Sequence, residues 1–128
     1  MITLDASVMI AYNYSKDPHH ESARRILGSS PDGSFVAHPM SIAETLVGAA
    51  RVGRESELLA LLGEVGVHAT RPASEEPLRL ARLHVSTGLK LPDCCVLSAA
   101  LSTRSAVATF DERLAVAARE LGLDVVSA

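Results

Sequence analysis

Near its start the chain reads Ile2-Thr3-Leu4-Asp5-Ala6-Ser7, a short apolar run that ends in an acid and leads into a helical pattern over residues 7–13. The apolar run predicts a buried strand over Ile2–Leu4. A similar order returns late in the chain, where a strand over residues 107–109 precedes Asp111 and a helix over residues 112–121. Strands and helices that alternate with short joins predict an α/β fold with a mainly parallel sheet.

The pattern between these two segments predicts the remaining elements. Helices are expected over residues 19–27, 41–52, 55–65, 74–87 and 92–101. Strands are expected over residues 35–37, 67–70 and 124–126, with a turn at residues 29–33 and a helix break at Gly53. The result is a central sheet of four to five short strands flanked by helices. No repeat or linker-like stretch interrupts the pattern, so residues 1–128 are expected to form a single domain.

The composition excludes several classes of protein. With 48% apolar and 21% charged residues, disorder is excluded as the main state. No apolar run approaches the ~20 residues that span a bilayer, and the first residues lack the basic and apolar regions of a signal peptide. We therefore expect a cytosolic protein without a membrane partner. Cys94 and Cys95 are adjacent and could pair only with strain, so no disulfide framework is expected.

The charge balance limits how this chain could bind nucleic acid. Its net charge of −3 argues against binding through overall positive charge. Most of its 12 basic residues are Arg, however, whose guanidinium binds phosphate through two parallel hydrogen bonds, so a local phosphate site stays open. Tyr and Phe make up only 3% of the chain, too few for the strand-borne stacking platforms of RRM or OB domains.

Four acids stand out by their position. Asp5 and Asp111 follow strands, whereas Glu44 and Asp93 lie near helix starts. Each could serve only the helix beside it, because Asp is a preferred N-cap and the dipole at a helix start favours an anion. Two pairs also fit the capping-box pattern S/T-x-x-E, namely Ser41 with Glu44 and Thr109 with Glu112.

The four acids taken together suggest a different role. In an open parallel sheet the strands' carboxyl ends and the following helix starts share one edge, which is where ligands bind. Four carboxylates on one edge repel one another, so their grouping predicts a bound cation. Because the candidate ligands are all oxygens, Mg²⁺ or Mn²⁺ is favoured over zinc. Such ions commonly serve phosphodiester chemistry.

Neighbouring residues are consistent with this chemistry. Glu44, Gly48 and Arg51 share one helix face, where Gly48 leaves room for a substrate backbone and Arg51 could hold a phosphate. A solvated surface charge is the alternative for Arg51. Ser7 and Thr109 could hydrogen-bond a ligand carboxylate or a water, although helix capping explains both hydroxyls equally simply.

The ordered set of these segments resembles the four motifs of PIN-domain ribonucleases. The segments are Leu4-Asp5-Ala6-Ser7, Ser41-Ile42-Ala43-Glu44, Pro92-Asp93 and Thr109-Phe110-Asp111, and the chain's size is similar to that of the VapC-type toxins of bacterial toxin–antitoxin pairs. The resemblance spans essentially the whole chain. It implies a parallel-sheet PIN fold, Mg²⁺- or Mn²⁺-dependent cleavage of RNA, homodimerisation and inhibition by a small antitoxin.

By this resemblance Asp5, Glu44, Asp93 and Asp111 would be the catalytic, metal-binding acids, and Ser7 and Thr109 would support them. Cys94-Cys95 departs from the family pattern, in which small or aliphatic residues usually follow the third acid. Free Cys behaves as a small hydrophobe, so we expect these two side chains to pack rather than to react.

Other readings remain open at this point. A dehalogenase-like phosphatase would need a second acid where Ser7 stands, and the His residues lack the HExxH-like spacing of zinc hydrolases. A PIN-like module that only binds is the main alternative to an enzyme. The leucine-rich helix over residues 55–65 is apolar on more than one face, which predicts a dimer seam, a groove for a partner helix, or core packing.

Overall fold

The computed structural model describes residues 1–30 and 34–126, and within them five short strands form one fully parallel sheet. The strands are β1 (Ile2–Leu4), β2 (Phe35–Ala37), β3 (Val67–Ala69), β4 (Ala106–Ala108) and β5 (Val125–Val126). Their order in the sheet is β3-β2-β1-β4-β5, so the first strand of the chain is the central one. The predicted α/β class with a parallel sheet is confirmed.

Seven helices in the described residues connect these strands. They are α1 (Ala6–Asn13), α2 (His20–Gly28), α3 (Pro39–Ala50), α4 (Glu55–Glu64), α5 (Glu76–Thr87), α6 (Leu91–Thr103) and α7 (Glu112–Glu120). Every helix and strand predicted from the sequence is present, with ends that differ by at most two residues. The predicted turn at residues 29–33 falls partly on residues 31–33, which lie outside the described residues.

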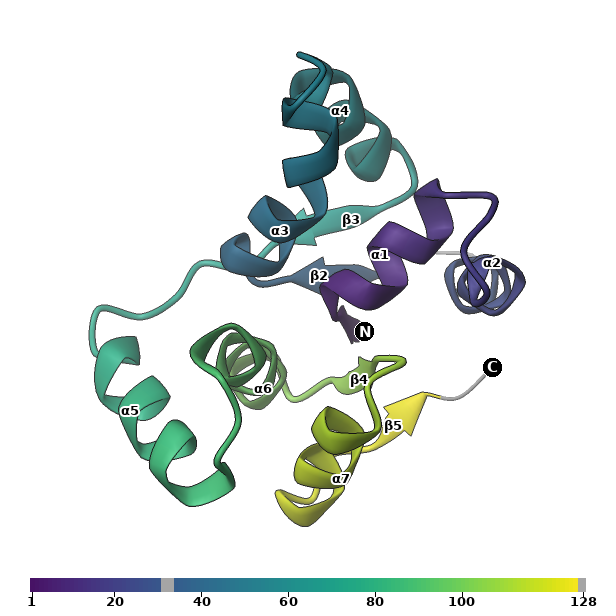
Figure 1. The fold of residues 1–128 in the computed structure, drawn as a ribbon. Helices are drawn as coiled ribbons and strands as arrows, with labels where there is room; N and C mark the ends of the chain where they lie inside the picture. Colours follow the sequence, from purple (N-terminus) through teal and green to yellow (C-terminus); the bar gives the residue numbers. More distant parts are fainter. Residues whose placement is uncertain (31–33, 127–128) are drawn as a thin grey trace.

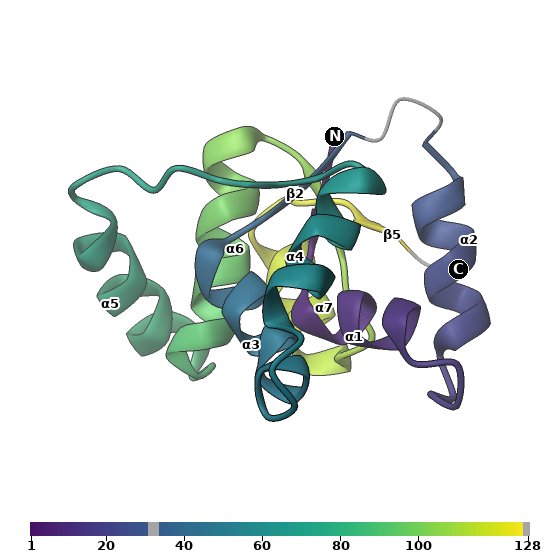
Figure 2. The same cartoon turned by 90° about the horizontal axis from the view of Figure 1, so that it is seen from above.

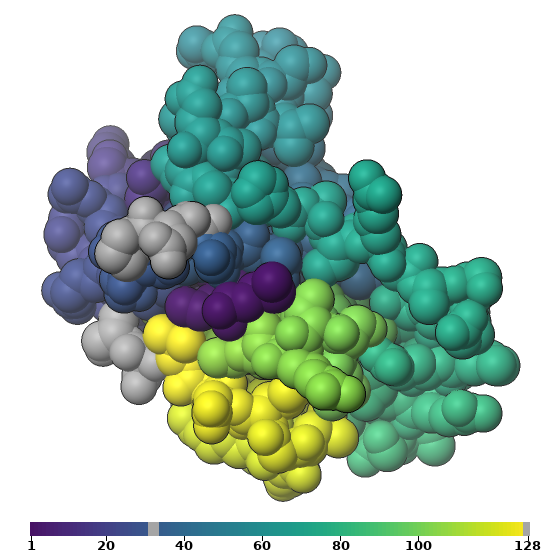
Figure 3. Space-filling view, turned by 180° about the vertical axis from the view of Figure 1, so that it is seen from behind, coloured from purple at the N-terminus to yellow at the C-terminus, as the bar shows by residue number. Residues whose placement is uncertain are grey.

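The helices surround the sheet (Figure 1). α6 packs against β1 and β4, α7 packs against β5, and α1 packs against both α2 and α3. α5 lies outside this arrangement, and its main neighbour is α6, as Figures 1 and 2 both show. The view from behind in Figure 3 shows the N-terminal residues in purple at the surface. β1 therefore starts on that side, and the neighbouring strands β2 and β4 run parallel to it.

The core explains why these short segments form strands. Apolar side chains fill both sides of the sheet, with Leu4 and Phe35 in one cluster and Val107 with Leu97 in another. A strand buried on both faces reads as a continuous apolar run rather than an alternating one, which matches the sequence pattern. α6 is buried around most of its circumference, as predicted, because it lies between α5 and the sheet.

Neither of the two capping boxes that the sequence pattern allowed is formed. α3 begins at Pro39 rather than at residue 41, because His38 caps the helix by accepting the backbone N–H of Met40 on Nδ1. The hydroxyl of Ser41, which would have been the cap, is instead buried without a hydrogen-bond partner among the described residues. α7 begins at Glu112, and its cap is the side chain of Asp111 rather than that of Thr109.

The leucine-rich helix α4 divides its apolar residues between core and surface. Leu62 is buried in the core and Val65 packs against the core's edge. Leu59 and Leu61 remain 50% and 43% exposed. Core packing therefore accounts for one face of α4 and leaves a second apolar face uncovered. In the part of the chain that the structure describes, no helix is long and apolar enough to cross a membrane.

Candidate active site

The sheet order creates a topological switch point beside β1. The chain leaves β1 toward β2 and β3 on one side, then returns to β4 and β5 on the other side. In open parallel sheets, ligands bind outside the carboxyl ends of the strands at such a point. Asp5 ends β1 at this position, and Thr109 and Asp111 follow β4, which is paired with β1.

Asp5 is buried and does not cap its helix. It stands at the N-cap position of α1, yet its side chain makes no capping hydrogen bond. Its Oδ2 atom accepts instead from the hydroxyls of Ser7 and Thr109, each at 2.7 Å. Ser7 Oγ in turn accepts the backbone N–H of Phe110 at 3.1 Å, and Thr109 Oγ1 accepts that of Asp111 at 3.0 Å. The carboxylate is therefore held in one orientation from both strand ends.

Glu44 and Asp93 lie close enough to Asp5 for their charges to interact. Partial burial, followed by the charges of Asp5 and Asp93, raises the pKa of Glu44 above its usual range. Partial burial and the charges of Asp5 and Asp111 likewise raise the pKa of Asp93. The charges that raise these two pKa values belong to other acids of the predicted set. The fold therefore brings all four acids to one region. Their mutual repulsion costs free energy that a bound cation would relieve.

The two carboxylate oxygens of Asp111 can serve different purposes, one as a helix cap and the other as a metal ligand. Its Oδ1 atom accepts the backbone N–H groups of Arg113 at 2.9 Å and Leu114 at 3.3 Å, which makes it the N-cap of α7. No described residue donates to its Oδ2 atom. The capping and ligand interpretations of this residue are therefore compatible.

The donor set is chemically suited to a hard divalent cation. Each acid offers carboxylate oxygen, and Asp5 Oδ1, like Asp111 Oδ2, accepts no hydrogen bond from the described residues. As the side chains lie, no three His, Cys, Asp or Glu residues in residues 1–30 and 34–126 are close enough to hold an ion without moving. Because the side chains of Glu44 and Asp93 are only partly buried, they would be free to move toward an ion held by Asp5.

The comparisons with known proteins agree with this arrangement. The family model described as the PIN domain matches residues 2–120. The chain belongs to the PIN-domain family. A comparison with curated protein sequences found no match.

Solved structures similar to this PIN domain include a toxin and a toxin–antitoxin complex. VapC20 of Mycobacterium tuberculosis, a toxin that cleaves the sarcin–ricin loop, aligns with a TM-score of 0.77 at 16% identity over 91% of this chain and 95% of its own. A toxin–antitoxin complex from Klebsiella pneumoniae aligns at 0.78, with 20% identity over 99% and 97%. VapBC-1 from nontypeable Haemophilus influenzae aligns at 0.69, with 19% identity over 99% and 98%. At these identities the similarity concerns the fold.

Two basic residues near the acids were missed by the sequence reasoning. The charges of Lys90 and Arg113 both lower the pKa of Asp93, in opposition to the larger effects of burial and neighbouring acids. Lys90 stands at the N-cap of α6, and Arg113 lies in the first turn of α7. The predicted phosphate-binding residue Arg51 is exposed at the end of α3, and an added Cβ at nearby Gly48 would meet open space. Lys90 and Arg113 could have been found only by knowing that α6 and α7 begin side by side.

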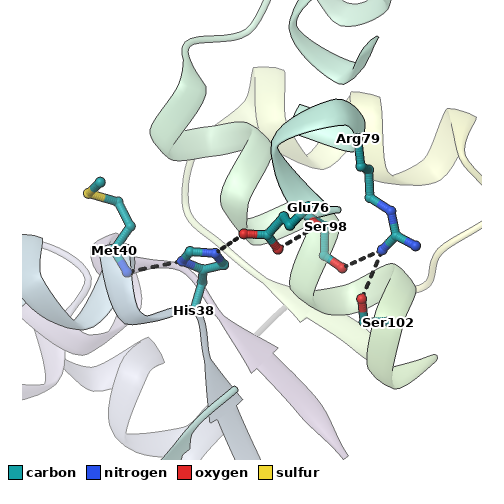
Figure 4. Close-up of polar contacts among 6 residues, drawn as sticks. All are labelled: His38, Met40, Glu76, Arg79, Ser98 and Ser102. Atoms are coloured by element: carbon teal, nitrogen blue, oxygen red, sulfur yellow. Dashed lines mark hydrogen bonds and ion pairs between the residues drawn. The ribbon is translucent and has the colours of Figure 1, made fainter. Parts of the chain in front are cut away.

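A polar network fixes the helices that carry Glu44 and Asp93 (Figure 4). His38 Nε2 donates to Glu76 Oε1 at 2.7 Å, because its Nδ1 already accepts the N–H of Met40. Glu76 Oε2 accepts the hydroxyl of Ser98 at 2.8 Å. Arg79 adds bonds from Nη1 to the Ser98 carbonyl oxygen and to Ser102 Oγ. The network joins the starts of α3 and α5 to the middle of α6.

The two cysteines fit the expected packing role. Both are free and buried in α6. Burial raises the pKa of the Cys94 thiol, and burial together with Glu76, Cys94 and Glu44 raises that of Cys95 to about 11. Since the thiolate is the reactive form, neither side chain is suited to act as a nucleophile near neutral pH.

Proposed function

We propose that this PIN domain is a Mg²⁺- or Mn²⁺-dependent endoribonuclease and that it acts in the cytosol as the toxin of a toxin–antitoxin pair. The main support is the state of Asp5, a buried carboxylate that caps no helix, accepts hydrogen bonds from Ser7 and Thr109, and helps to raise the pKa of both Glu44 and Asp93 by its charge. A purely structural acid at this position would be expected to bond the N–H groups of α1.

The residues divide the work as follows. Asp5, Glu44, Asp93 and Asp111 would hold the ion, while Ser7 and Thr109 keep Asp5 in one orientation. When bound, Mg²⁺ or Mn²⁺ polarises the phosphate and lowers the pKa of a water that attacks it. The RNA phosphates on either side of the cleaved one could be bound by Lys90, Arg113 and Arg51. No carboxylate attacks the phosphorus, so hydrolysis should leave a 5′-phosphate and a 3′-hydroxyl.

The alternatives have less support. A dehalogenase-like phosphatase needs a proton-donating acid at position 7, and the Ser7 hydroxyl there is committed to Asp5. A module that only binds would not need a repelling group of four acids. The deciding experiment incubates the protein with total RNA and Mg²⁺ or Mn²⁺, beside the Asp5→Asn variant. Cleavage by the wild type alone supports the proposal, whereas cleavage in EDTA or products ending in 2′,3′-cyclic phosphate would contradict it.

The exposed apolar surface of α4 is suited to contact with another protein chain. We propose that the protein forms a homodimer and binds a small antitoxin, since one of the similar structures is a toxin–antitoxin complex from Klebsiella pneumoniae. Leu59 and Leu61 on α4 and Val52 in the preceding turn are exposed apolar residues suited to a partner's amphipathic helix. An Arg from that partner could pair with the acids and compete with the metal.

A further inference from the structure

Beside the acids, the exposed ring of His19 stacks on the partly buried ring of Phe110, and the proposed chemistry uses neither ring. The imidazole of His19 and the phenyl ring of Phe110 have centroids 4.5 Å apart and planes inclined by 13°. They line a hollow of about 280 Å³ together with Thr109 and Asp111. The scarcity of Tyr and Phe had argued against a stacking surface, but a histidine supplies the second ring.

Both rings are held in place by the backbone around them. Phe110 lies between Thr109 and Asp111, packs against the core, and donates its N–H to Ser7 Oγ, which is bonded to Asp5. The His19 N–H donates to Asp17 Oδ1 at 2.8 Å. The adjacent His20 ring bonds the Ala11 carbonyl oxygen and so anchors the start of α2 to α1. The pair is therefore rigidly connected to the oriented carboxylate.

The chemistry of the hollow favours an uncharged planar ligand. Asp111 and Glu112 line it, and its cation Arg119 lies 3.9 Å from Glu112, so a phosphate group would meet repulsion there. The face of a nucleobase carries no charge and stacks on aromatic rings whatever the base. Exposed His19 leaves one ring face available for this contact.

We propose that His19 and Phe110 form a stacking platform for a base of single-stranded RNA that flanks the phosphate to be cleaved. The inference rests on the proposed ribonuclease function. Stacking supplies binding that does not depend on positive charge, which suits a protein whose net charge is −3. The phosphate itself would lie toward the acids and Arg113, while the neighbouring base lies on the rings.

The test compares His19→Ala, His19→Phe and Phe110→Leu with His68→Ala, an exposed histidine on β3 that serves as the control. Removing one ring should raise KM for a single-stranded RNA by about ten-fold with little change in kcat, because base–aromatic stacking is worth ~1–3 kcal/mol. His19→Phe keeps a ring without the imidazole nitrogens and should retain the wild-type KM. If Phe110→Leu does not fold, His19→Ala and His19→Phe still decide the question.

A binding measurement separates this proposal from the ribonuclease function. Asp5→Asn protein with Mg²⁺ is titrated with a single-stranded RNA that carries 2-aminopurine, whose fluorescence falls on stacking, and with the same RNA made abasic at that position. We expect binding to quench the 2-aminopurine fluorescence and His19→Ala to abolish this quenching. We also expect the abasic RNA to bind more weakly than the 2-aminopurine RNA when His19 is present, and equally well when His19 is replaced by Ala. Equal binding by all variants would overturn the platform even if the wild type cleaves RNA. An inactive wild type that still shows ring-dependent quenching would contradict the nuclease function and leave the platform standing.

Discussion

Asp5 and Asp111 occupy the same position, the residue before a helix, but their side chains do different things. Asp111 uses one oxygen to cap α7, whereas Asp5 makes no capping bond to α1 and accepts from Ser7 and Thr109 instead. A residue that contributes to a helix start stabilises the fold, while a residue held among like charges destabilises the metal-free protein. Substitution can distinguish the two cases.

Asp5→Asn and Asp93→Asn should abolish RNA cleavage and leave the metal-free protein as stable as the wild type or more stable, since each change relieves repulsion. Asn also keeps an oxygen that can accept from Ser7 and Thr109. Melting temperature in EDTA and cleavage with Mg²⁺ are measured on the same preparations. Glu57→Gln, which removes an exposed ion pair with Arg54, is the control and should change neither by much. A lower melting temperature with normal cleavage would assign these acids a purely structural role.

Ser41→Ala should be neutral or stabilising. The Ser41 hydroxyl is buried and unpartnered among the described residues, so its removal relieves a desolvation cost. Had Ser41 been the cap of α3, the same change would cost ~1 kcal/mol. Ser98→Ala is the matched comparison, because it removes the bond to Glu76 and should cost about 1 kcal/mol. Denaturant unfolding of both variants gives their free energies of unfolding. A clearly lower free energy of unfolding for Ser41→Ala would show that the Ser41 hydroxyl does make a stabilising hydrogen bond.

Among the helices, α4 carries both buried core residues and exposed apolar residues that could contact a partner. Leu62→Ala should destabilise the protein by ~2–5 kcal/mol, since Leu62 is almost completely buried. Leu59→Lys and Leu61→Lys should fold normally, because both side chains are exposed. We expect each to weaken the proposed homodimer or the proposed antitoxin complex, measured by light scattering and by titration with a candidate antitoxin. If both associations persist, the partner binds elsewhere.

Element patterns were predictable because they depend on local sequence. Every strand and helix followed from apolar runs and helical spacing, and the error at α3 came from reading Ser41 and Glu44 as a cap when Pro39 and His38 start the helix. The four acids were identified by their place after strands and at helix starts. The His19–Phe110 stack and the His38–Glu76 bond join residues far apart in sequence, so no spacing rule could have found them.

For the whole molecule, the acids link stability to pH and to metal. The folded state raises the pKa of Glu44 and Asp93 above the ordinary values of 4.5 and 3.8, so it binds protons more tightly than the unfolded chain. Stability from these groups should therefore fall as pH rises above about 4 and level off once both are ionised. Saturating Mg²⁺ or Mn²⁺ should oppose this fall, because cation binding to the folded protein raises its stability.

The measurement is the melting temperature across this pH range, in EDTA and with Mg²⁺, for the wild type and for Glu44→Gln with Asp93→Asn. The double variant should show a shallower fall in EDTA and little response to Mg²⁺. Identical pH slopes in the two proteins would mean that the acids do not interact as the structure indicates.

The position of β1 in the sheet also determines when, during synthesis, the proposed active site can form. The central strand is made first, but the hydroxyl of Thr109 that orients Asp5 lies 104 residues further along the chain. β1 cannot complete its pairing until β4 has left the ribosome. A nascent or prematurely terminated chain therefore carries Asp5 and Glu44 without the strand that aligns them, and any nuclease activity should begin only when synthesis of this region is nearly finished. An inhibitor that recognises the folded protein thus has no need to act earlier.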